Sequence, residues 1–348
     1  MDSNFHTASQ HHSITASQKY IKWGIIGCGD VTEVKSGPAF NRVANSELLA
    51  VMRRDAIKAK DYALRHGFPL WYSNADDLIN HPEVNAIYIA TPPHVHAELA
   101  IKALQAGKPV YVEKPMALNY LQAQEMIQAA EKYQTPLFVA YYRRALPGFL
   151  KVKSLIESGA IGTVRMVSMQ LYKALSLIDT DTELPWRVQP EMAGGGHFFD
   201  LASHQLDYMD YLFGPVKAVK SFALNQTNQY VAEDIVSAGF LMENGVLVNG
   251  SWCFTVPGFL EKDSIEIIGE NGAISFSCFG FEPVQLKTKA GIQSFDFPKP
   301  KHVQQDLIQQ VVDELLGKGK SPSTGVSGAR TNWVMDEVVN EYYKKFKK

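Results

Sequence analysis

Short apolar segments alternate with amphipathic ones through the first 140 residues. The apolar segments have the length of strands and lie at 22–26, 48–52, 86–90, 109–112 and 137–140. The amphipathic segments have the spacing of helices and lie at 55–66, 96–106 and 120–133. Glycine or proline follows each helix, as is typical of helix ends. Strands that alternate with helices predict βαβ units, and right-handed crossovers then give a doubly wound parallel sheet.

The second half of the chain has a different pattern, in which strands follow one another. Strand-like segments lie at 164–172, 216–224, 234–241, 246–254, 264–268, 273–276 and 284–287. Asn-Gly pairs at 244–245 and 271–272 mark hairpins. Helices are expected at 147–158, 199–213, 303–316 and 328–346. This half predicts an α+β domain with a large open, mostly antiparallel sheet.

The two patterns divide the chain into parts. We predict a disordered tail over residues 1–20, a doubly wound domain over 21–143 and the α+β domain over 144–348. The tail is polar and has no apolar periodicity. A chain of 348 residues is also too long for one typical core, which agrees with two domains. The fold class is therefore α/β.

Composition and charge narrow the class of function. The chain is 46% hydrophobic and 20% charged, which is typical of globular proteins and excludes a fibrous one. Its net charge of −2 offers no basic excess, so we expect no nucleic-acid partner. Three cysteines without a CxxC pair predict no disulfide framework. No apolar run reaches the ~18 residues of a membrane span, and the first residues do not resemble a secretory signal, so we expect no membrane partner and a cytoplasmic location.

A glycine turn follows the first strand. Gly27 and Gly29 permit a tight turn and the close approach of a pyrophosphate, and a helix follows whose N-terminus favours negative charge. Thr32 stands where a third small residue is usual, so we expect it to crowd the helix against the strand. An ordinary glycine turn is the alternative interpretation. The position after the first strand of a βαβ unit favours a dinucleotide site in a Rossmann domain. Its expected residues are Gly27, Cys28, Gly29, Asp30 and Val31.

The end of the second strand bears on the choice of cofactor. Sites for NAD place an acidic residue there to bind the adenosine ribose, but this chain has Met52. Arg53 and Arg54 follow, and a guanidinium group matches a phosphate bidentately. The pattern favours NADP, with its 2′-phosphate on the two arginines. Asp55 leaves NAD possible, with the arginines then merely solvated.

Three further motifs carry a family resemblance. They are Thr91-Pro92 with His96 at the end of the fourth strand, Glu113-Lys114-Pro115 at the end of the fifth, and GGGHFFD at 194–200 followed by His204. In this order, together with the glycine turn, they resemble the glucose–fructose oxidoreductase, inositol dehydrogenase and rhizopine catabolism family (Gfo/Idh/MocA). The resemblance extends over nearly all of the chain after residue 20.

The resemblance implies an NAD(P)-dependent oxidoreductase that moves a hydride between nicotinamide and a sugar, a polyol or a related cyclic hydroxy or oxo compound. It places Lys114 beside the nicotinamide and makes His204 the proton donor or acceptor. It also implies that Asp200 binds the hydroxyl groups of the substrate. A reacting hydroxyl must lose a proton as its carbon loses hydride, which agrees with a lysine and a histidine. Asp200 and His204 are four residues apart and share one helix face.

The resemblance also implies further site residues. Expected at the cofactor, besides the turn and the two arginines, are Thr91, Pro92, His96, Glu113 and Lys114. Expected at the substrate are Arg144, Trp186, Arg187, Asp200 and His204. The first three of these substrate residues could equally form a packing cluster between the domains. We expect no metal at His197, Asp200 and His204.

Two other functions stay open at this point. One is a redox-assisted glycosidase, which oxidises and re-reduces its sugar without net turnover of the cofactor. The other is a non-catalytic NADP-binding sensor, against which the combination of Lys114, Asp200 and His204 argues. One face of the second sheet lacks covering helices in this interpretation, so we expect a homodimer or homotetramer.

Overall fold

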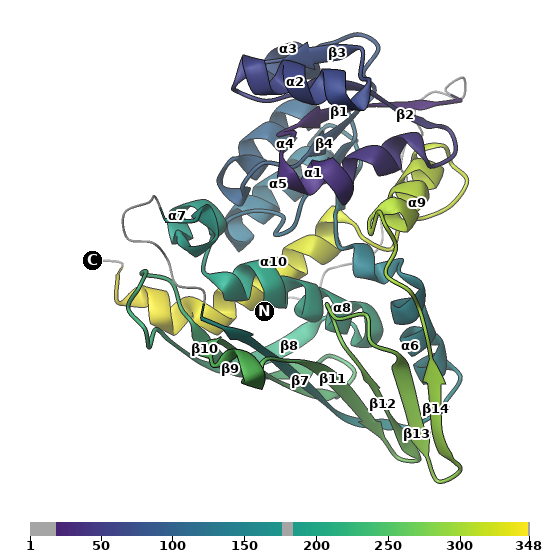
Figure 1. Cartoon of the computed structure of the whole chain (residues 1–348), viewed down its shortest axis with the longest axis vertical. Helices are drawn as coiled ribbons and strands as arrows, with labels where there is room; N and C mark the ends of the chain where they lie inside the picture. Colours follow the sequence, from purple (N-terminus) through teal and green to yellow (C-terminus); the bar gives the residue numbers. More distant parts are fainter. Residues whose placement is uncertain (1–18, 176–183, 347–348) are drawn as a thin grey trace.

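The computed structural model describes residues 19–175 and 184–346. All but the last two residues of the predicted tail lie outside this part of the chain. Two sheets form the two halves of the molecule, and the long C-terminal helix α10 (Gly325–Lys344) runs between them (Figure 1). The predicted fold is confirmed.

The first sheet has six parallel strands in the order β3-β2-β1-β4-β5-β6. They are β1 (Ile21–Ile26), β2 (Ser46–Met52), β3 (Leu70–Tyr72), β4 (Ala86–Ile89), β5 (Val110–Val112) and β6 (Leu137–Val139). Its helices are α1 (Asp30–Val34), α2 (Ala56–His66), α3 (Ala75–Ile79), α4 (His96–Gln105) and α5 (Tyr120–Lys132). The order reverses between β1 and β4, and ligands of such sheets bind at that point beyond the carboxyl ends of the strands.

The sequence missed β3 and α3, which have three and five residues. Elements this short complete no hydrophobic period, and β3 is defined by its pairing with the last residues of β2. The position of β3 matters because it is the edge strand beside the end of β2, after which Arg53 and Arg54 follow.

The second sheet has eight strands in the order β14-β13-β12-β11-β7-β10-β9-β8. They are β7 (Val164–Ala174), β8 (Val216–Leu224), β9 (Ile235–Met242), β10 (Leu247–Val256), β11 (Lys262–Gly269), β12 (Gly272–Phe276), β13 (Val284–Thr288) and β14 (Gly291–Phe295). Only β7 and β10 pair in parallel, and the other neighbours are antiparallel. The unpredicted β14 is almost fully exposed and pairs only with β13.

One face of this sheet is covered by helices. Helices α6 (Pro147–Glu157), α8 (Ser203–Phe213) and α10 share its core, in which Trp252 and Phe198 are fully buried. Residues on the strands alternate between buried and exposed, as expected for a sheet with one covered face. The predicted helix at 199–213 begins with a π-helical turn at Phe198–Ala202 and continues as α8.

The C-terminal region packs against the first sheet again, although the predicted division assigned all residues after 143 to the second domain. Helix α9 (Gln305–Leu315) buries Leu307, Ile308 and Val311 in the same core as Trp23 and Phe40 of the N-terminal domain. In Figure 1 it lies beside the short helical turn Gly37–Asn41 that follows α1. None of the helices in the described residues is long and apolar enough to cross a bilayer.

Candidate active site

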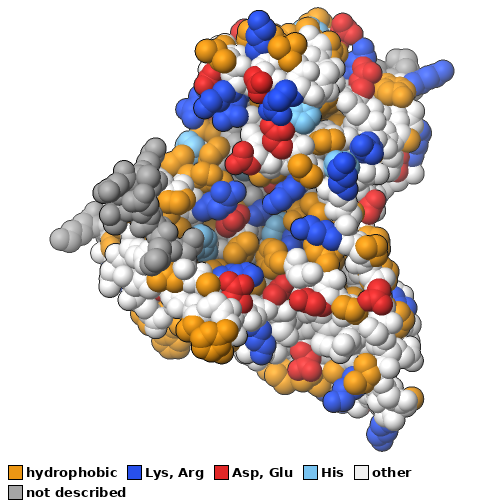
Figure 2. Space-filling view, viewed as in Figure 1, with side chains coloured by type: hydrophobic (Ala, Val, Ile, Leu, Met, Phe, Trp, Pro, Cys, Tyr) orange, Lys and Arg blue, Asp and Glu red, His pale blue; other side chains and the backbone are white. Residues whose placement is uncertain are grey.

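A cleft of about 860 Å³ opens at the carboxyl ends of β1, β2, β4 and β5 and is closed from the other side by the second domain. Basic, acidic and histidine side chains gather at the waist of the molecule between the two halves (Figure 2). Of the residues expected at the cofactor, these line the cleft: Gly27, Cys28, Gly29, Asp30, Val31, Arg53, Arg54, Thr91, Pro92, Glu113 and Lys114.

The two turn glycines are required for different reasons. Gly27 has φ +94°, and a Cβ there would come within 2.7 Å of the Thr91 side chain and 2.8 Å of the Thr91 backbone nitrogen. A Cβ on Gly29 would meet nothing closer than 4.0 Å, so packing within the protein does not demand glycine there. Gly29 instead keeps open space in the cleft. The amides of Gly27 and Cys28 bond to Met52, which leaves the first amides of α1 for an anion.

The sequence predicts that Thr32 crowds the helix against the sheet, but the structure shows no such crowding. Its hydroxyl donates to the Gly29 carbonyl at 2.7 Å, and its carbonyl accepts from Tyr62 at 2.9 Å. The buried threonine is therefore fully bonded. Helix α1 ends two residues later at Val34, so close packing along a long helix is not needed.

The end of β2 is basic, as expected. Met52 is buried, and Arg53 donates from Nη1 to the Cys28 carbonyl at 3.2 Å, which holds its guanidinium beside the glycine turn. Asp55 caps α2, because its carboxylate accepts the amides of Ile57 at 3.0 Å and Lys58 at 3.1 Å. Asp55 also lines the cleft, and the cap engages one of its two carboxylate oxygens, Oδ1.

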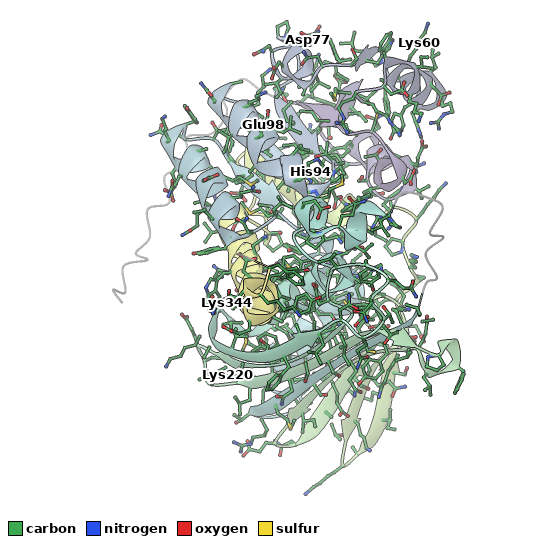
Figure 3. The ribbon with its side chains drawn as sticks, turned by 90° about the vertical axis from the view of Figure 1, so that its left-hand side faces the viewer. Lys60, Asp77, His94, Glu98, Lys220 and Lys344 are labelled. Atoms are coloured by element: carbon green, nitrogen blue, oxygen red, sulfur yellow. The ribbon has the colours of Figure 1, made fainter. Side chains whose placement is uncertain are left out.

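His96 was expected at the cofactor, and the structure places it behind the cleft. It is fully buried between the ends of β4 and β5, with Nε2 2.7 Å from the Thr91 carbonyl and Nδ1 3.1 Å from the Pro115 carbonyl. Burial lowers the pKa of His96 to about 4, so the neutral ring donates to one of the two carbonyls. The histidine of this segment that lines the cleft is His94, which lies toward the middle of the molecule in Figure 3. The segment carries both histidines, and only packing decides which of them faces the cleft.

Two polar atoms of this wall fit a bound nucleotide. Thr91 Oγ1 and His94 Nδ1 are buried and have no hydrogen-bond partner in the described part of the chain. Buried polar atoms are nearly always bonded, and both residues line the cleft. Together with the open space at Gly29, they fit a dinucleotide that lies across the ends of β1 and β4.

Glu113 lies at the bottom of the cleft in a network that the sequence did not reveal. Its carboxylate accepts from the Tyr88 hydroxyl at 2.5 Å and from Gln304 Nε2 at 2.6 Å, and Tyr111 donates to the same Gln304 at 2.9 Å. Gln304 precedes α9, 191 residues from Glu113. The return of α9 to the first domain therefore fixes the carboxylate next to Lys114.

Lys114 and Asp200 meet across the two domains. Lys114 Nζ donates to Asp200 Oδ1 and to the Asp200 carbonyl, both at 2.6 Å, and Arg187 Nε lies 3.2 Å from Asp200 Oδ2. Burial alone would raise the pKa of the Asp200 carboxyl, but the Lys114 ammonium, aided by Arg187, holds it below its usual value. The site thus contains an ionised carboxylate and a clamped ammonium group.

His204 lies beside this pair in an aromatic enclosure. Its ring centroid is 5.1 Å from that of Tyr142, 5.9 Å from Phe279 and 6.0 Å from Tyr141. The imidazole lines the cleft, while its Nδ1 is buried and has no partner in the described residues. Burial, with the charges of Arg143 and Lys114, lowers the pKa of His204 well below its usual value, so the ring is uncharged at neutral pH.

The expected substrate residues separate into two groups. Trp186 and Arg187 line the cleft, and the guanidinium carbon of Arg187 lies 4.5 Å from the Trp186 ring centroid. Arg144 does not line the cleft and is almost completely buried. It donates to both carboxylate oxygens of Asp207 at 2.7 and 2.9 Å, so it belongs to the packing cluster that the sequence left open.

The three glycines before His197 act as spacers. A Cβ on Gly194 would come within 2.4 Å of the Leu118 carbonyl, and a Cβ on Gly196 within 2.7 Å of the Glu233 carbonyl. Gly196 also donates its amide to Glu233 Oε1 at 2.9 Å, and Tyr343 of α10 donates to Oε2 at 2.5 Å. These close contacts position the turn that carries Asp200 between the loop after Lys114 and the second sheet.

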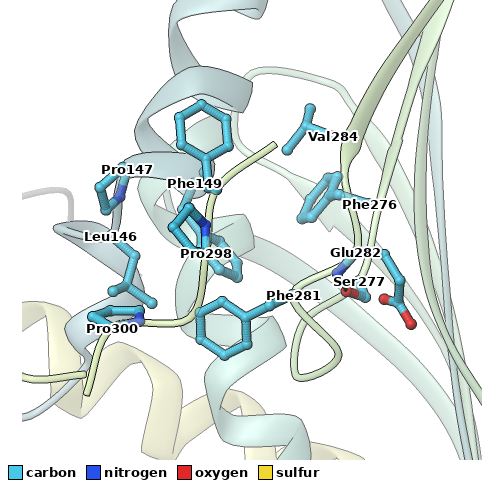
Figure 4. A pocket seen from close by; sticks show the side chains of 12 residues that line it. Leu146, Pro147, Phe149, Phe276, Ser277, Phe281, Glu282, Val284, Pro298 and Pro300 are labelled. Atoms are coloured by element: carbon cyan, nitrogen blue, oxygen red, sulfur yellow. Dashed lines mark hydrogen bonds between the residues drawn. The ribbon is translucent and has the colours of Figure 1, made fainter. Parts of the chain in front are cut away.

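A second pocket and the residues considered for a metal site offer no further candidate for catalysis within the described residues. The pocket holds about 30 Å³, room for one water, and is lined by proline and phenylalanine side chains beside Leu146 (Figure 4). His197 packs against Phe254 and Tyr230. Among the described residues, no three His, Cys, Asp or Glu side chains are grouped to hold a metal ion.

Comparisons with known proteins agree with this geometry. A family model described as oxidoreductase family, NAD-binding Rossmann fold, matches residues 21–141, and one described as GFO/IDH/MocA C-terminal domain matches residues 149–275. Oxidoreductase P35 of Formosa agariphila is 42% identical over 317 residues, which cover 91% of this chain and 97% of that protein. Trans-1,2-dihydrobenzene-1,2-diol dehydrogenase of Xenopus tropicalis is 28% identical over 80% of this chain and 81% of its own.

The fold is also that of a solved sugar dehydrogenase. Levoglucosan dehydrogenase in complex with NADH and levoglucosan superimposes with a TM-score of 0.82 at 22% identity, over 94% of this chain and 98% of that one. The residues matched by the two family models include the glycine turn, the segment with Lys114 and the helix with His204. The chain therefore belongs to the Gfo/Idh/MocA family of oxidoreductases with an NAD-binding Rossmann domain.

Proposed function

We propose that the protein is an NADP-dependent dehydrogenase or reductase of a sugar, a polyol or a related cyclic hydroxy or oxo compound. The observation that carries the proposal is the contact of Lys114 with Asp200 beside the uncharged His204, at the inner end of a nucleotide cleft. When bound, the nicotinamide supplies the hydride acceptor or donor. The chain itself must bind the substrate and move one proton.

We assign these tasks to three residues. His204 is uncharged and accepts the proton of a reacting hydroxyl. Lys114 brings a positive charge to the oxygen on which negative charge develops. Asp200 keeps lone pairs free beside its contacts with Lys114 and Arg187 and orients a neighbouring hydroxyl. In the reductive direction the same groups return the proton to the carbonyl oxygen.

The preference for NADP rests on charge at the end of β2. Arg53 and Arg54 line the cleft with Lys58, and Asp55 is engaged in capping α2. A 2′-phosphate matches the three cations, whereas an NAD ribose would have only Asp55, whose Oδ1 is already engaged in the cap. Arg53 is held beside the turn by its bond to the Cys28 carbonyl, so less freedom is lost on binding.

The proposed substrate class is based on the residues that line the inner end of the cleft. Aromatic rings of Tyr142, Trp186 and Phe279 face polar groups of Lys114 and Asp200. A ring with one apolar face and adjacent hydroxyls suits such a site. The names of the two dehydrogenases compared above, for a cyclic diol and for levoglucosan, agree with this class.

We also propose that two copies pair through the open sheet. Its uncovered face carries exposed Phe222, Leu224 and Leu247 among small polar and charged side chains such as Asn249 and Lys220. Apolar side chains gathered on a regular surface favour association with a second copy. This supports the homodimer or homotetramer expected from the sequence.

A screen of sugars, polyols and cyclic diols with both cofactors, followed at the absorbance of the reduced nicotinamide, tests the function. On the substrate found, Lys114→Met and His204→Asn should each lower turnover by about 10²–10⁴ and leave cofactor affinity within a few-fold. The double variant should lose less than the product, because the two groups act as a unit. Lys60→Met, on the exposed surface of α2, is the matched control and should behave as wild type.

Other outcomes decide between the functions left open. Near-normal turnover by Lys114→Met refutes its role, and parallel loss of cofactor binding and activity in both variants makes the residues structural. Release of sugar without net reduced cofactor indicates the glycosidase. Tight cofactor binding with no turnover of any compound indicates the sensor.

A further inference from the structure

Arg143 is a buried cation that the proposed mechanism does not use. Only 2% of it is exposed, and Nε donates to the Cys278 carbonyl at 2.8 Å. Among the described residues no carboxylate lies within ion-pair distance of it, although the Asp263 carboxylate acts on its charge from farther away. Nη1 is buried without a hydrogen-bond partner in the same part of the chain. A buried charge without a paired carboxylate is costly, so a purely structural role would be served better by an apolar side chain.

Arg143 and His204 contact the same two aromatic rings. The guanidinium carbon lies 4.4 Å from the ring centroid of Phe279 and 5.0 Å from that of Tyr142. The imidazole of His204 contacts these rings at 5.9 and 5.1 Å between centroids. The cation and the imidazole are therefore both buried against one pair of aromatic rings rather than exposed to bulk water. A charge acts strongly across such a medium because screening is weak.

The ring of Phe279 is held in place from two sides. The carboxylate of Asp263 accepts the backbone amides of Cys278, Phe279 and Gly280 at 3.0, 2.6 and 3.0 Å. Arg143 binds the same loop through the Cys278 carbonyl. Asp263 is thus engaged by three amides, and the loop keeps Phe279 between the guanidinium and the cleft.

The charges that act on the pKa of His204 are positive. Arg143 and Lys114 lower the pKa of His204, after burial as the largest cause, and Lys35 adds to them. On its own helix, Asp200 pairs with Lys114 and Asp207 pairs with Arg144. The titratable and charged groups on the elements around the imidazole are Lys35, Lys114, Tyr141, Tyr142, Arg143, Asp200, Asp207, Asp263 and Cys278.

We propose that Arg143 is a positioning residue that acts across Phe279 and Tyr142 and keeps His204 uncharged and facing the substrate. The inference rests on the proposed role of His204 as proton acceptor. Arg143 does not contact the substrate, since it lies behind the rings that line the cleft. Its charge, rather than its bulk, is what the site requires.

Two matched substitutions separate charge from shape. Arg143→Met keeps a long side chain over Phe279 and removes the charge, whereas Arg143→Lys keeps the charge. Removal of a nearby cation favours the protonated imidazole, so the pKa of His204 must rise in Arg143→Met. We expect a rise of about one pH unit or more, given weak screening over this distance, and little change in Arg143→Lys.

The first measurement needs neither substrate nor activity. Histidine ring signals of ¹³C-labelled protein are titrated by NMR, with His204→Asn used to assign the signal of His204. The second measurement is the pH profile of kcat/KM on the substrate found. Its acid limb should move to higher pH in Arg143→Met, and a limb that moves by one pH unit lowers the activity on its acid side about tenfold relative to wild type.

Failure of this inference can be distinguished from failure of the proposed function. An unchanged His204 titration in folded Arg143→Met overturns the inference, as does an equal change in Arg143→Lys. Wild-type turnover by His204→Asn refutes the proposed proton acceptor, while the NMR titration still decides whether Arg143 controls the imidazole. If Arg143→Met fails to fold, Phe279→Leu tests the same path: it should change the titration of His204, and an unchanged titration overturns the inference.

Discussion

Arg144 gives the most decisive prediction, because the sequence left it between the substrate site and a packing cluster, and the structure places it outside the cleft. It donates through Nε and Nη2 to Asp207, through Nη2 to Asp210 at 2.9 Å and through Nη1 to the Pro322 carbonyl at 3.0 Å. Its side chain is 4% exposed and that of Asp207 is fully buried. Arg144→Met therefore leaves the Asp207 carboxylate buried without its cation.

The size of the effect follows from which charges remain paired. Asp210 keeps Arg330, whose Nε and Nη2 donate to it at 2.7 and 2.8 Å, so only Asp207 is left uncompensated. Removing one partner of a buried pair costs about 3–5 kcal/mol of unfolding free energy. With an unfolding entropy of roughly 2.1 cal/mol/K per residue, that loss lowers Tm by about 4–7 °C for a chain of this length.

Urea unfolding followed by tryptophan fluorescence measures the loss. Arg330→Met is the matched control, since Arg330 is 37% exposed and Asp210 keeps Arg144; it should cost only about 1 kcal/mol. Adding Asp207→Asn to Arg144→Met removes the orphaned charge and should recover part of the loss. A stability within about 1 kcal/mol of wild type, together with a raised KM, would refute this reasoning and return Arg144 to the substrate site.

The remaining predictions concern the cofactor. The double variant Arg53→Ala, Arg54→Ala should weaken NADP binding about ten- to a hundredfold and change NAD binding little, measured by fluorescence titration of both; equal losses for both, or a wild-type preference for NAD, would contradict the NADP assignment. Gly29→Ala should keep the Tm and lose cofactor affinity, because its Cβ enters open space of the cleft, whereas Gly27→Ala should lower the Tm, because its Cβ strikes the Thr91 backbone. Equal effects of the two alanines on Tm would contradict this division.

Local patterns were enough for most of the fold. The strands of the first sheet, the change to an antiparallel sheet and the hairpins at the Asn-Gly pairs all depend on periodicity and turn chemistry within short windows. The glycine turn at Gly27 and the segment around Lys114 were found because each directly follows a strand. The carboxyl ends of parallel strands share one edge, so their order along the chain already brings them together.

Contacts between distant segments were not predictable in this way. Arg143 and Arg144 are neighbours in sequence, yet one lies behind Phe279 and the other binds Asp207, 63 residues away. The same holds for His94 and His96, of which only the first faces the cleft, and for Gln304, which reaches Glu113 only because α9 returns to the first sheet.

Sequence alone determined which elements form and which chemical groups stand at their ends, because both depend on nearest neighbours along the chain. Tertiary structure alone decided which of two adjacent arginines or nearby histidines serves the site, because burial and pairing depend on elements that pack from far away. The unpaired charge of Arg143 has no signature in the sequence, because it depends on the rings around the guanidinium and on there being no carboxylate within ion-pair distance among the described residues.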